Sequence, residues 1–390
     1  MNATPTANRL HIGFFGKRNS GKSSLVNAFV GQEVAVVSDV PGTTTDPVYK
    51  AVEIKPLGAC TVIDTAGYDD DQGEIGKSRV EKTRLAAEKC DIAVIVTATD
   101  DIDGETELYN KFKEKNVPVL FIVNKTDEGD KSSIAQKLFE KTKQKAILTS
   151  TLTGEGIELI RPALARLMPE DFGAQSITGD LAKAGDVVML IMPQDIQAPA
   201  GRLIMPQAQT IRELLDKKCI IVSSSADKME EALAALSAPP ALIITDSQVF
   251  DYVYARKPEA SKLTSFSVLF AAYKGDINAY TQGAAAIDRL NGNSKVLIAE
   301  CCAHAPTTDD IGRVKIPAML RARYGQGLQV EVVSGTDFPE DLTGYDLIIQ
   351  CGACMFNKRY VLSRIERAQN QGVPITNYGI AIAHIKGIPL

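Results

Sequence analysis

The sequence predicts an α/β protein of three domains with parallel sheets. Short hydrophobic runs rich in β-branched residues alternate with amphipathic stretches along the chain, as in parallel strands joined by helices. At 390 residues the chain is too long for one ordinary domain. A stretch rich in proline, glycine and serine at residues 168–180 has the composition of a linker.

The amino-acid composition favours some classes of protein over others. A hydrophobic content of 45% supports buried cores, and the net charge of −5 gives no sign of attraction to nucleic acid or anionic lipid. The N-terminus resembles no signal peptide, and no hydrophobic stretch is long enough to span a bilayer. We therefore expect a cytoplasmic protein without membrane or nucleic-acid partners, whose seven cysteines serve as metal ligands, catalysts or core residues.

The first domain, expected at residues 1–170, should have a doubly wound sheet. Each of its hydrophobic runs is short enough for a strand and is followed by a stretch long enough for a helix. Strands are predicted at 11–16, 60–64, 92–98, 117–125 and 145–150, with helices at 23–31, 82–90, 107–116 and 132–142.

Two smaller α/β domains are expected after the linker, at residues 177–265 and 266–390. The middle domain carries no chemical motif. Its strands are predicted at 186–193, 218–225 and 241–246, with helices at 210–218 and 227–236. The last domain has strands predicted at 295–301, 328–333 and 346–351, with helices at 277–290, 316–325 and 357–372.

A phosphate-binding loop follows the first predicted strand. The stretch from Gly16 to Ser23, GKRNSGKS, has the Gly-x-x-x-x-Gly-Lys-Ser pattern and opens a predicted helix, as the motif requires. Glycines let the backbone curl around phosphates, Lys22 would reach the β- and γ-phosphates, and the Ser23 hydroxyl would bind Mg²⁺. The nucleotide phosphates are expected to contact Gly16, Asn19, Ser20, Gly21, Lys22, Ser23 and Ser24.

Further motifs follow in the order of a GTP-binding protein. Asp64-Thr65-Ala66-Gly67 offers a carboxylate near Mg²⁺ and a glycine amide for the γ-phosphate. In Asn124-Lys125-Thr126-Asp127, the Asp127 carboxylate can accept from two guanine nitrogens, a pattern that adenine does not present. Ser150 is expected beside the guanine edge. The ordered set predicts that this domain binds GTP.

Residues 11–167 resemble the G domains of Era- and MnmE-type GTPases. In these proteins a threonine of the first switch loop completes the Mg²⁺ shell, which the resemblance assigns to Thr44, with Thr43 next. The implied catalytic residues are Lys22, Thr44 and Gly67. Thr151 stands where the family usually has alanine.

Two residues bear on the rate of hydrolysis. Tyr68 stands where Ras-like proteins carry the glutamine that orients the attacking water, so intrinsic hydrolysis should be slow. Asn19 stands where relatives of MnmE hold a potassium ion. A monovalent cation there would replace an arginine finger, so we expect potassium to stimulate hydrolysis.

Cysteines gather near the C-terminus in two motifs. Cys302-Ala303-His304 follows one predicted strand, and Cys351-Gly352-Ala353-Cys354 follows another. The carboxyl ends of neighbouring parallel strands share one edge of a sheet, so three thiolates and an imidazole should meet there. The remaining Cys60, Cys90 and Cys219 lie in or beside hydrophobic runs and are expected in the cores. Three sulfurs and one nitrogen suit tetrahedral zinc, and they also suit a four-iron cluster with one weakly held corner.

The combination of these motifs with an N-terminal GTPase resembles the HydF family of FeFe-hydrogenase maturation GTPases over essentially the whole chain. That family carries Cys-x-His, a long gap, and then His-Cys-x-x-Cys; here residues 305–350, 46 in all, separate His304 from Cys351. The resemblance implies a 4Fe-4S cluster on Cys302, Cys351 and Cys354. Gln350 stands in place of the family's histidine, and an amide is a poor iron ligand. The fourth ligand stays open among His304, Asp309, Asp310, Glu300 and Cys301.

The resemblance implies a scaffold or carrier. It would hold a diiron precursor with carbonyl, cyanide and dithiolate ligands, built with two radical-SAM enzymes, and deliver it to apo-hydrogenase. GTP hydrolysis would govern partner release, and the middle domain would form a homodimer.

Two other hypotheses remain. The first is a ribosome- or tRNA-associated GTPase with a zinc-stabilised C-terminal module. Against it, residues 266–390 hold 12 Lys and Arg and 11 Asp and Glu, a net charge of +1 where an RNA-binding face should be basic. The second is a redox switch, in which the state of the cluster would set the rate of GTP hydrolysis.

Overall fold

A computed structural model of the chain divides into two compact units, Met1–Ala174 and Gln175–Leu390. The first corresponds to the predicted first domain. The second contains two separate sheets, which correspond to the two smaller domains. The residues that the structure describes are 4–31, 35–40, 47–69, 73–169, 172–173, 175–193, 203–301 and 310–389.

The first unit is built on a seven-stranded sheet in the order β2-β3-β4-β1-β5-β6-β7. The strands from β4 to β7 in this order are parallel, whereas β3 runs antiparallel to both β2 and β4. The sequence predicted all five parallel strands and missed β2 and β3, whose sequences AVVSDV and VYKAVEI contain no continuous hydrophobic run. The strands are β1 Leu10–Phe15, β2 Ala35–Val40, β3 Val48–Ile54, β4 Gly58–Asp64, β5 Ile92–Thr97, β6 Val119–Val123 and β7 Ala146–Leu148.

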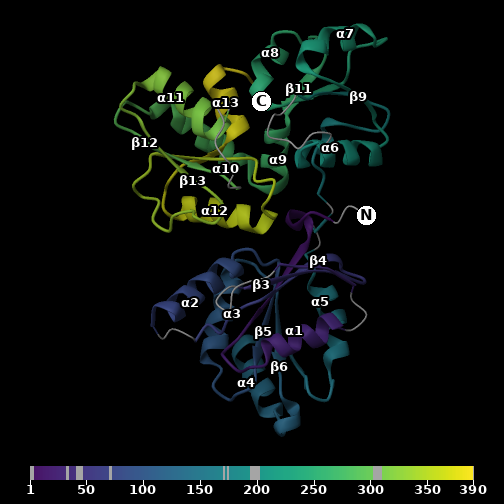
Figure 1. The fold of residues 1–390 in the computed structure, drawn as a ribbon, viewed down its shortest axis with the longest axis vertical. Helices are drawn as coiled ribbons and strands as arrows, with labels where there is room; N and C mark the ends of the chain where they lie inside the picture. The colour runs from purple at the N-terminus through teal and green to yellow at the C-terminus, as the bar shows by residue number, and fades with distance from the viewer. Residues whose placement is uncertain are drawn as a thin grey trace. The chain divides into compact units, whose positions relative to one another are not determined.

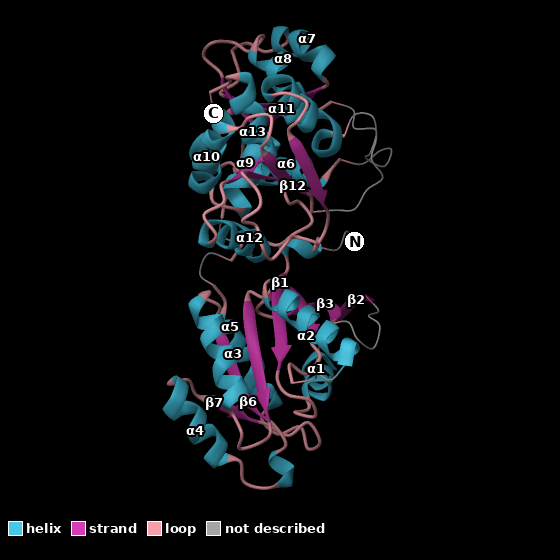
Figure 2. Ribbon diagram, turned by 90° about the vertical axis from the view of Figure 1, so that its left-hand side faces the viewer, coloured by secondary structure: helices cyan, strands magenta, loops and turns pink. Residues whose placement is uncertain are grey.

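Helices cover both faces of this sheet (Figures 1 and 2). Leu25 and Phe29 of α1 and Ile160 of α5 join one hydrophobic core, and Phe112 of α3 and Leu138 of α4 join the other. The loops after β1, β4, β6 and β7 therefore share the carboxyl edge of the parallel strands, where α/β proteins bind ligands. The helices are α1 Lys22–Gly31, α2 Gly73–Ala87, α3 Asp103–Glu114, α4 Ser132–Thr142 and α5 Ile160–Leu167.

The second unit begins with a four-stranded parallel sheet in the order β11-β10-β8-β9. The central strand β10 is buried along its whole length, whereas β9 lies at the edge and exposes Ile220. The strands are β8 Val187–Ile191, β9 Ile220–Ser224, β10 Leu242–Thr245 and β11 Lys262–Ser265, with helices α6 Met205–Asp216, α7 Met229–Ala234 and α8 Phe250–Tyr254.

The second sheet of this unit is also parallel, in the order β13-β12-β14-β15. It places β12 beside β14, as the sequence predicted for the two strands that precede the cysteine motifs. The strands are β12 Lys295–Ala299, β13 Gln329–Val333, β14 Leu347–Gln350 and β15 Ile375–Asn377, with helices α10 Ile277–Ala284, α11 Ile316–Tyr324, α12 Lys358–Asn370 and α13 Tyr378–Lys386.

Helix α9, Phe266–Lys274, contributes to the cores of both sheets in the second unit. Phe266 and Phe270 pack into the core of the first sheet, and Ala271 packs into the core of the second. The helix begins at Ser265, whose hydroxyl accepts a hydrogen bond from the amide of Val268. Because one helix contributes to both cores, the two sheets of this unit are mechanically connected.

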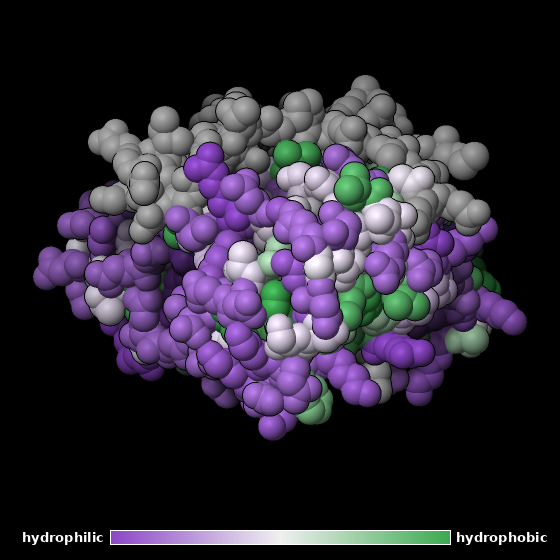
Figure 3. Space-filling view, turned by 90° about the horizontal axis from the view of Figure 1, so that it is seen from below, coloured by the Kyte–Doolittle hydropathy of each residue, from purple (hydrophilic) through white to green (hydrophobic). Residues whose placement is uncertain are grey.

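The surface shown in Figure 3 is mainly hydrophilic, with hydrophobic residues in small separate groups. Scattered exposed hydrophobic side chains of this kind are usual on globular proteins. None of the described helices has the length and hydrophobicity needed to cross a bilayer.

Candidate functional site

The phosphate-binding loop lies between the end of β1 and the start of α1. A Cβ added to Gly16 would lie 2.1 Å from the carbonyl oxygen of Val96, and one added to Gly21 would lie 2.2 Å from the side-chain nitrogen of Asn124. Asn19, between them, has a φ of 61°, which asparagine adopts more readily than most residues. The loop is therefore a tight backbone turn at a helix N-terminus, the arrangement that binds phosphate.

Lys22 folds into this loop. It is only 7% exposed, and its Nζ donates to the carbonyl oxygens of Gly16 at 2.9 Å and Lys17 at 2.7 Å. Burial lowers the pKa of Lys22, and the carboxylates of Asp64 and Asp69 oppose that shift. The ammonium lies where phosphate oxygens would replace the two carbonyls as acceptors.

Ser23 and Asp64 offer oxygen ligands beside Lys22. The Ser23 hydroxyl hydrogen-bonds the Asp64 carboxylate, and burial raises the pKa of Asp64 despite this bond and the Lys22 charge. Asp64 Oδ1 is buried and has no hydrogen-bond partner within the described part of the chain. An unpartnered carboxylate oxygen beside a hydroxyl suits Mg²⁺, which prefers hard oxygen ligands. The residues present therefore fit a magnesium ion.

The loop after β4 presses against the phosphate loop. A Cβ on Gly67 would lie 2.7 Å from the amide nitrogen of Arg18, so a larger residue would push the two loops apart. The same Arg18 amide donates to Asp69 Oδ1 at 2.7 Å. Gly67 thus has its backbone at the edge of the phosphate loop, as a γ-phosphate contact requires.

Tyr68 packs against the first turn of α3. A Cβ on Gly104 would lie 2.7 Å from Cε2 of the Tyr68 ring, so the ring packs closely against this glycine. Burial raises the pKa of the Tyr68 hydroxyl, and the nearby charge of Glu105 raises it further. In this position Tyr68 provides no amide to orient an attacking water.

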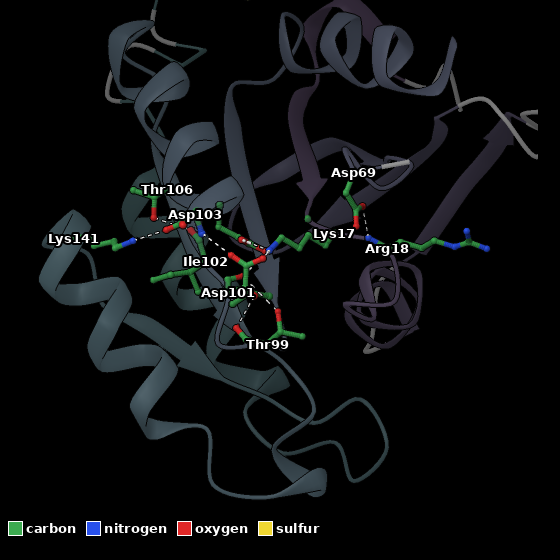
Figure 4. Close-up of polar contacts among 12 residues, drawn as sticks. Lys17, Arg18, Asp69, Thr99, Asp101, Ile102, Asp103, Thr106 and Lys141 are labelled. Carbon is green, nitrogen blue, oxygen red and sulfur yellow. Dashed lines mark hydrogen bonds and ion pairs between the residues drawn. The ribbon is translucent and has the colours of Figure 1, made fainter. Parts of the chain in front are cut away.

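Lys17 ties the phosphate loop to α3, as Figure 4 shows. Its Nζ donates to both the carbonyl oxygen and Oδ2 of Asp101 at 2.7 Å, and it lies 3.7 Å from Oε2 of the fully buried Glu105. Burial alone would lower the pKa of Lys17, but Asp101 and Glu105 outweigh it and raise that pKa. No sequence motif marks this contact, because its partners lie more than eighty residues along the chain.

Asn124 connects the phosphate loop to the proposed base-binding loops. It is fully buried, its Nδ2 donates to the carbonyl oxygen of Ser20 at 3.1 Å, and its Oδ1 accepts from the Thr149 hydroxyl at 3.2 Å. Lys125 follows with a φ of 67°, which turns the chain sharply at the end of β6. Asn124 therefore connects the phosphate loop, the loop after β6 and the loop after β7.

Asp127 and Ser150 lie together at the proposed guanine site. The Ser150 hydroxyl donates to Asp127 Oδ1 and itself accepts from the amides of Leu152 and Thr153 at 3.2 Å. Ser150 is fully buried, so the contact fixes the direction of the Asp127 carboxylate. Thr43 and Thr44, expected at the Mg²⁺ site, lie outside the described residues.

Three cysteines meet at the carboxyl edge of the last sheet. Ala299 of β12 pairs with Gln350 of β14, so both strands end at the same level. The Cys301 amide donates to Cys351 Sγ at 3.1 Å, and Cys301 Sγ lies 4.0 Å from Cys354 Sγ. Hydrogen bonding with Cys301 raises the pKa of the Cys351 thiol, and burial adds to the rise. By contrast, Cys60, Cys90 and Cys219 are buried elsewhere, as the sequence predicted.

Thiols are the type of donor that binds soft metals, but the described residues do not by themselves form a metal site. Within the described ranges, no set of three or more His, Cys, Asp and Glu side chains is arranged to hold a metal ion. The predicted ligand Cys302 and the candidates His304 and Asp309 lie outside these ranges. The thiols that are described are soft ligands at a sheet edge, which suits iron–sulfur clusters and zinc alike.

Two other candidate ligands already have partners. Glu300 Oε2 contacts Nη2 of Arg313 at 3.0 Å and accepts from the Ser334 hydroxyl at 3.2 Å. Asp310 Oδ1 accepts from the Arg313 amide at 2.8 Å, at the start of the π-helical turn Ile311–Lys315. A metal would have to compete with these contacts for either carboxylate.

Gln350 is turned into the core. It is fully buried, and its Nε2 donates to the Tyr280 hydroxyl at 3.0 Å. Its Oε1 has no hydrogen-bond partner among the described residues. The amide that replaces the family's histidine therefore binds a tyrosine of α10.

Comparison with known proteins relates the first unit to GTPases. Residues 11–125 match a family described as 50S ribosome-binding GTPase. The chain is 37% identical over 155 residues to the tRNA modification GTPase MnmE of Nitrosomonas europaea, covering 39% of this chain and 33% of that protein. It is 30% identical over 161 residues to MnmE of Trichormus variabilis, covering 41% of this chain and 34% of that protein. The match thus spans about a third of these relatives' length.

Solved structures give a weaker likeness. One is the cytosolic domain of the T. maritima FeoB iron transporter in a GDP form, with 22% identity and a TM-score of 0.33. That match covers 42% of this chain and 65% of the other.

The second unit matches two domains of a single family. Residues 177–275 match the hydrogen maturase F dimerization domain, and residues 278–389 match the hydrogen maturase F tetramerization domain. Together with the GTPase match, these two domains account for most of the chain in the order that the sequence predicted. The chain belongs to the hydrogen maturase F (HydF) family and carries a GTPase domain.

Proposed function

We propose that this protein is a GTPase that carries a metal precursor in hydrogenase maturation. Its C-terminal cysteines would bind a 4Fe-4S cluster, hold a diiron precursor of the FeFe-hydrogenase active site, and deliver it to apo-hydrogenase. The observation that carries the proposal is that the proposed ligands Cys351 and Cys354 both lie beside Cys301, the neighbour of Cys302 in the chain, within a domain matched to hydrogen maturase F.

The GTPase step follows from the first unit. Lys22 would bind the β- and γ-phosphate oxygens, while Ser23, Asp64 and Thr44 would hold and orient Mg²⁺. The Gly67 amide would contact the γ-phosphate from the other side. Charge developing on the transferred phosphoryl group would thus be stabilised by preorganised donors.

Guanine would be selected by Asp127. Ser150 holds the carboxylate in one direction, so its oxygens can accept from the ring N–H and the amine of guanine. Adenine presents no matching pair of donors to this carboxylate, and that loss disfavours ATP.

Hydrolysis would be slow without a cation. Tyr68 packs against α3 and carries no amide that could orient water as glutamine does, and Lys17 is held by Asp101. Potassium bound near Asn19 would supply the missing positive charge.

The cluster ligands would be Cys302, Cys351 and Cys354, with His304 or a carboxylate at the fourth iron. When bound, the cluster would supply an iron with an exchangeable position, to which the precursor could attach. The protein's part is to keep the thiols at the sheet edge and to keep Gln350 out of the ligand set.

The family descriptions support a larger assembly. One domain is described as a dimerization domain and the other as a tetramerization domain, so we propose a homodimer that can associate further. Two radical-SAM enzymes would build the precursor on this assembly, and GTP hydrolysis would release partners.

One observation favours a zinc-containing alternative. The 4.0 Å between Cys301 Sγ and Cys354 Sγ is close to the roughly 3.8 Å that separates two thiolates on one tetrahedral zinc, with Zn–S bonds of about 2.3 Å. Sulfurs bound to different irons of a cluster lie farther apart. This alternative is a ribosome- or tRNA-associated GTPase with a zinc-stabilised C-terminal module.

Transfer to apo-hydrogenase tests the proposal. The loaded protein should restore hydrogen evolution to purified apo-hydrogenase, a C351A/C354A variant should not, and C60A, a buried cysteine elsewhere, should do so normally. A Lys22→Ala variant should load normally but release partners slowly. Restoration of activity by the C351A/C354A variant would exclude the carrier function, and normal transfer by Lys22→Ala would exclude the role of GTP.

A further inference from the structure

A buried lysine holds the loop that contains the last two cysteines. Lys274, at the end of α9, donates from Nζ to three carbonyl oxygens of that loop: Ala353 at 3.2 Å, Cys354 at 3.1 Å and Phe356 at 2.9 Å. Lys274 as a whole is only 2% exposed to solvent. Buried carbonyls need donors, and here one ammonium supplies three carbonyls of an irregular segment.

The same helix fixes the start of the loop. Ser267 of α9 donates to Asn377 Oδ1 at 2.8 Å, and Asn377 Nδ2 donates to the carbonyl oxygen of Cys351 at 3.4 Å. Ser267 and Lys274 are seven residues apart and so lie on one face of the helix, two turns from each other. The loop Cys351–Phe356 is thus held at both ends from α9.

The charge of Lys274 lies beside the cysteine loop. Its Nζ is 3.1 Å from the carbonyl oxygen of Cys354, a proposed cluster ligand, and 3.2 Å from that of Ala353. A buried ammonium is costly unless it is hydrogen-bonded and paired. Carbonyl oxygens satisfy its hydrogen bonds, but only anionic groups balance its charge.

We propose that Lys274 is a positioning residue of the cysteine site, which fixes the Cys351–Phe356 loop and places a positive charge beside the metal group bound there. The loop-fixing part concerns the protein without metal. The electrostatic part rests on the proposed cluster function.

Three substitutions separate the two parts. Lys274→Arg keeps the charge and several donors, Lys274→Gln keeps donors without charge, and Lys274→Met removes both at similar length. Lys262→Met, at an exposed position on β11, is the matched control.

Amide hydrogen exchange of the metal-free full-length protein tests the loop. We expect exchange in residues 351–356 to be about tenfold faster in the Met variant, less affected in the Gln variant, and near wild type in the Arg variant. Slow exchange of the amides of β8 and β12 shows that a variant is folded. If the Met variant does not fold, the comparison of the Gln and Arg variants decides whether Lys274 fixes the loop. Unchanged loop exchange in folded variants would overturn the proposal.

The midpoint potential of the reconstituted cluster tests the charge. Removing a nearby positive charge disfavours the reduced, more negative cluster. The Gln variant should therefore hold the same amount of iron at a more negative potential, and the Arg variant should restore the potential. Equal potentials in all variants would show that Lys274 only fixes the loop, and would overturn the electrostatic part of the proposal. If the wild-type protein binds no iron, the proposed function fails, and the exchange experiment still decides whether Lys274 positions the loop.

Discussion

The side-chain nitrogen of Gln350 lies 3.0 Å from the Tyr280 hydroxyl, inside the core and beside the cysteines. The hydrogen bond connects β14, which leads into the Cys351–Phe356 loop, to helix α10. In this position Gln350 contributes a buried hydrogen bond to the fold around the site.

Gln350→Ala should therefore reduce stability without reducing iron binding. The Tyr280 hydroxyl would lose its buried donor, at a cost of about 1–2 kcal/mol. Urea unfolding and iron analysis of the reconstituted protein measure the two effects, and Gln329→Ala on the exposed edge strand β13 is the control. A clear loss of iron at unchanged stability would instead make Gln350 a ligand.

Asp127→Asn should change which nucleotide binds. The asparagine amide cannot accept from both guanine donors, so GTP affinity should fall by about a hundredfold or more. Xanthine carries a carbonyl where guanine carries an amine, so xanthosine triphosphate should bind better than GTP. Titration with both nucleotides checks this, and Asp130→Asn, in the exposed turn before α4, controls for loss of charge. Unaltered GTP affinity would show that Asp127 does not bind the guanine base.

Potassium should stimulate GTP hydrolysis through Asn19. We expect hydrolysis to be faster in potassium than in sodium at equal ionic strength, and Asn19→Ala to lower the potassium rate by about tenfold or more. Asn116→Ala is a suitable control, because Asn116 also has a positive φ but lies away from the loop, after α3. Equal rates in the two salts would show that the missing charge is not supplied by potassium.

The second unit should lose stability in acid through Glu213. This carboxylate accepts from the Ser176 hydroxyl at 2.8 Å and from the Thr178 amide at 2.9 Å and hydroxyl at 2.7 Å. Burial alone would raise the pKa of Glu213, but these hydrogen bonds outweigh it and lower the pKa below the ordinary value of a glutamate. The ionised form is thus favoured by folding.

The contribution of Glu213 to stability is therefore complete above the pKa of the unfolded chain and is lost as pH falls through the lower, folded pKa. Glu213→Gln should be less stable than wild type at neutral pH, and the difference should shrink in acid. Urea unfolding across this pH range measures it, with Glu259→Gln, at an exposed position, as control. A difference that stays constant with pH would contradict this account.

Local sequence patterns predicted most of the parallel strands and the loops that follow them, but missed the parallel edge strands β11 and β15. Hydrophobic runs marked β1, β12 and β14, because a strand buried on both faces must be hydrophobic throughout. The same runs placed the phosphate loop and the cysteine motifs at strand ends. The antiparallel strands β2 and β3 were not predicted, because AVVSDV and VYKAVEI mix polar with hydrophobic residues and contain no continuous hydrophobic run.

Contacts between distant segments could not be predicted in this way. Lys17 meets Asp101, and Lys274 meets Cys354, only after the chain has folded. Neither lysine lies in a recognisable spacing with its partner, and an isolated lysine in a sequence is usually exposed. Cys301 likewise looked secondary to Cys302, although the structure places its sulfur beside Cys354.

The central claim is that the cysteines hold an iron–sulfur cluster, and anaerobic reconstitution tests it most directly. The purified protein is supplied with iron and sulfide, and its metal content and the EPR spectrum of the reduced form are measured. The account predicts about four irons per chain and a reduced cubane signal, both lost on changing Cys302, Cys351 or Cys354 to Ala. Tightly bound zinc that iron does not displace would contradict the account and favour the zinc-containing GTPase.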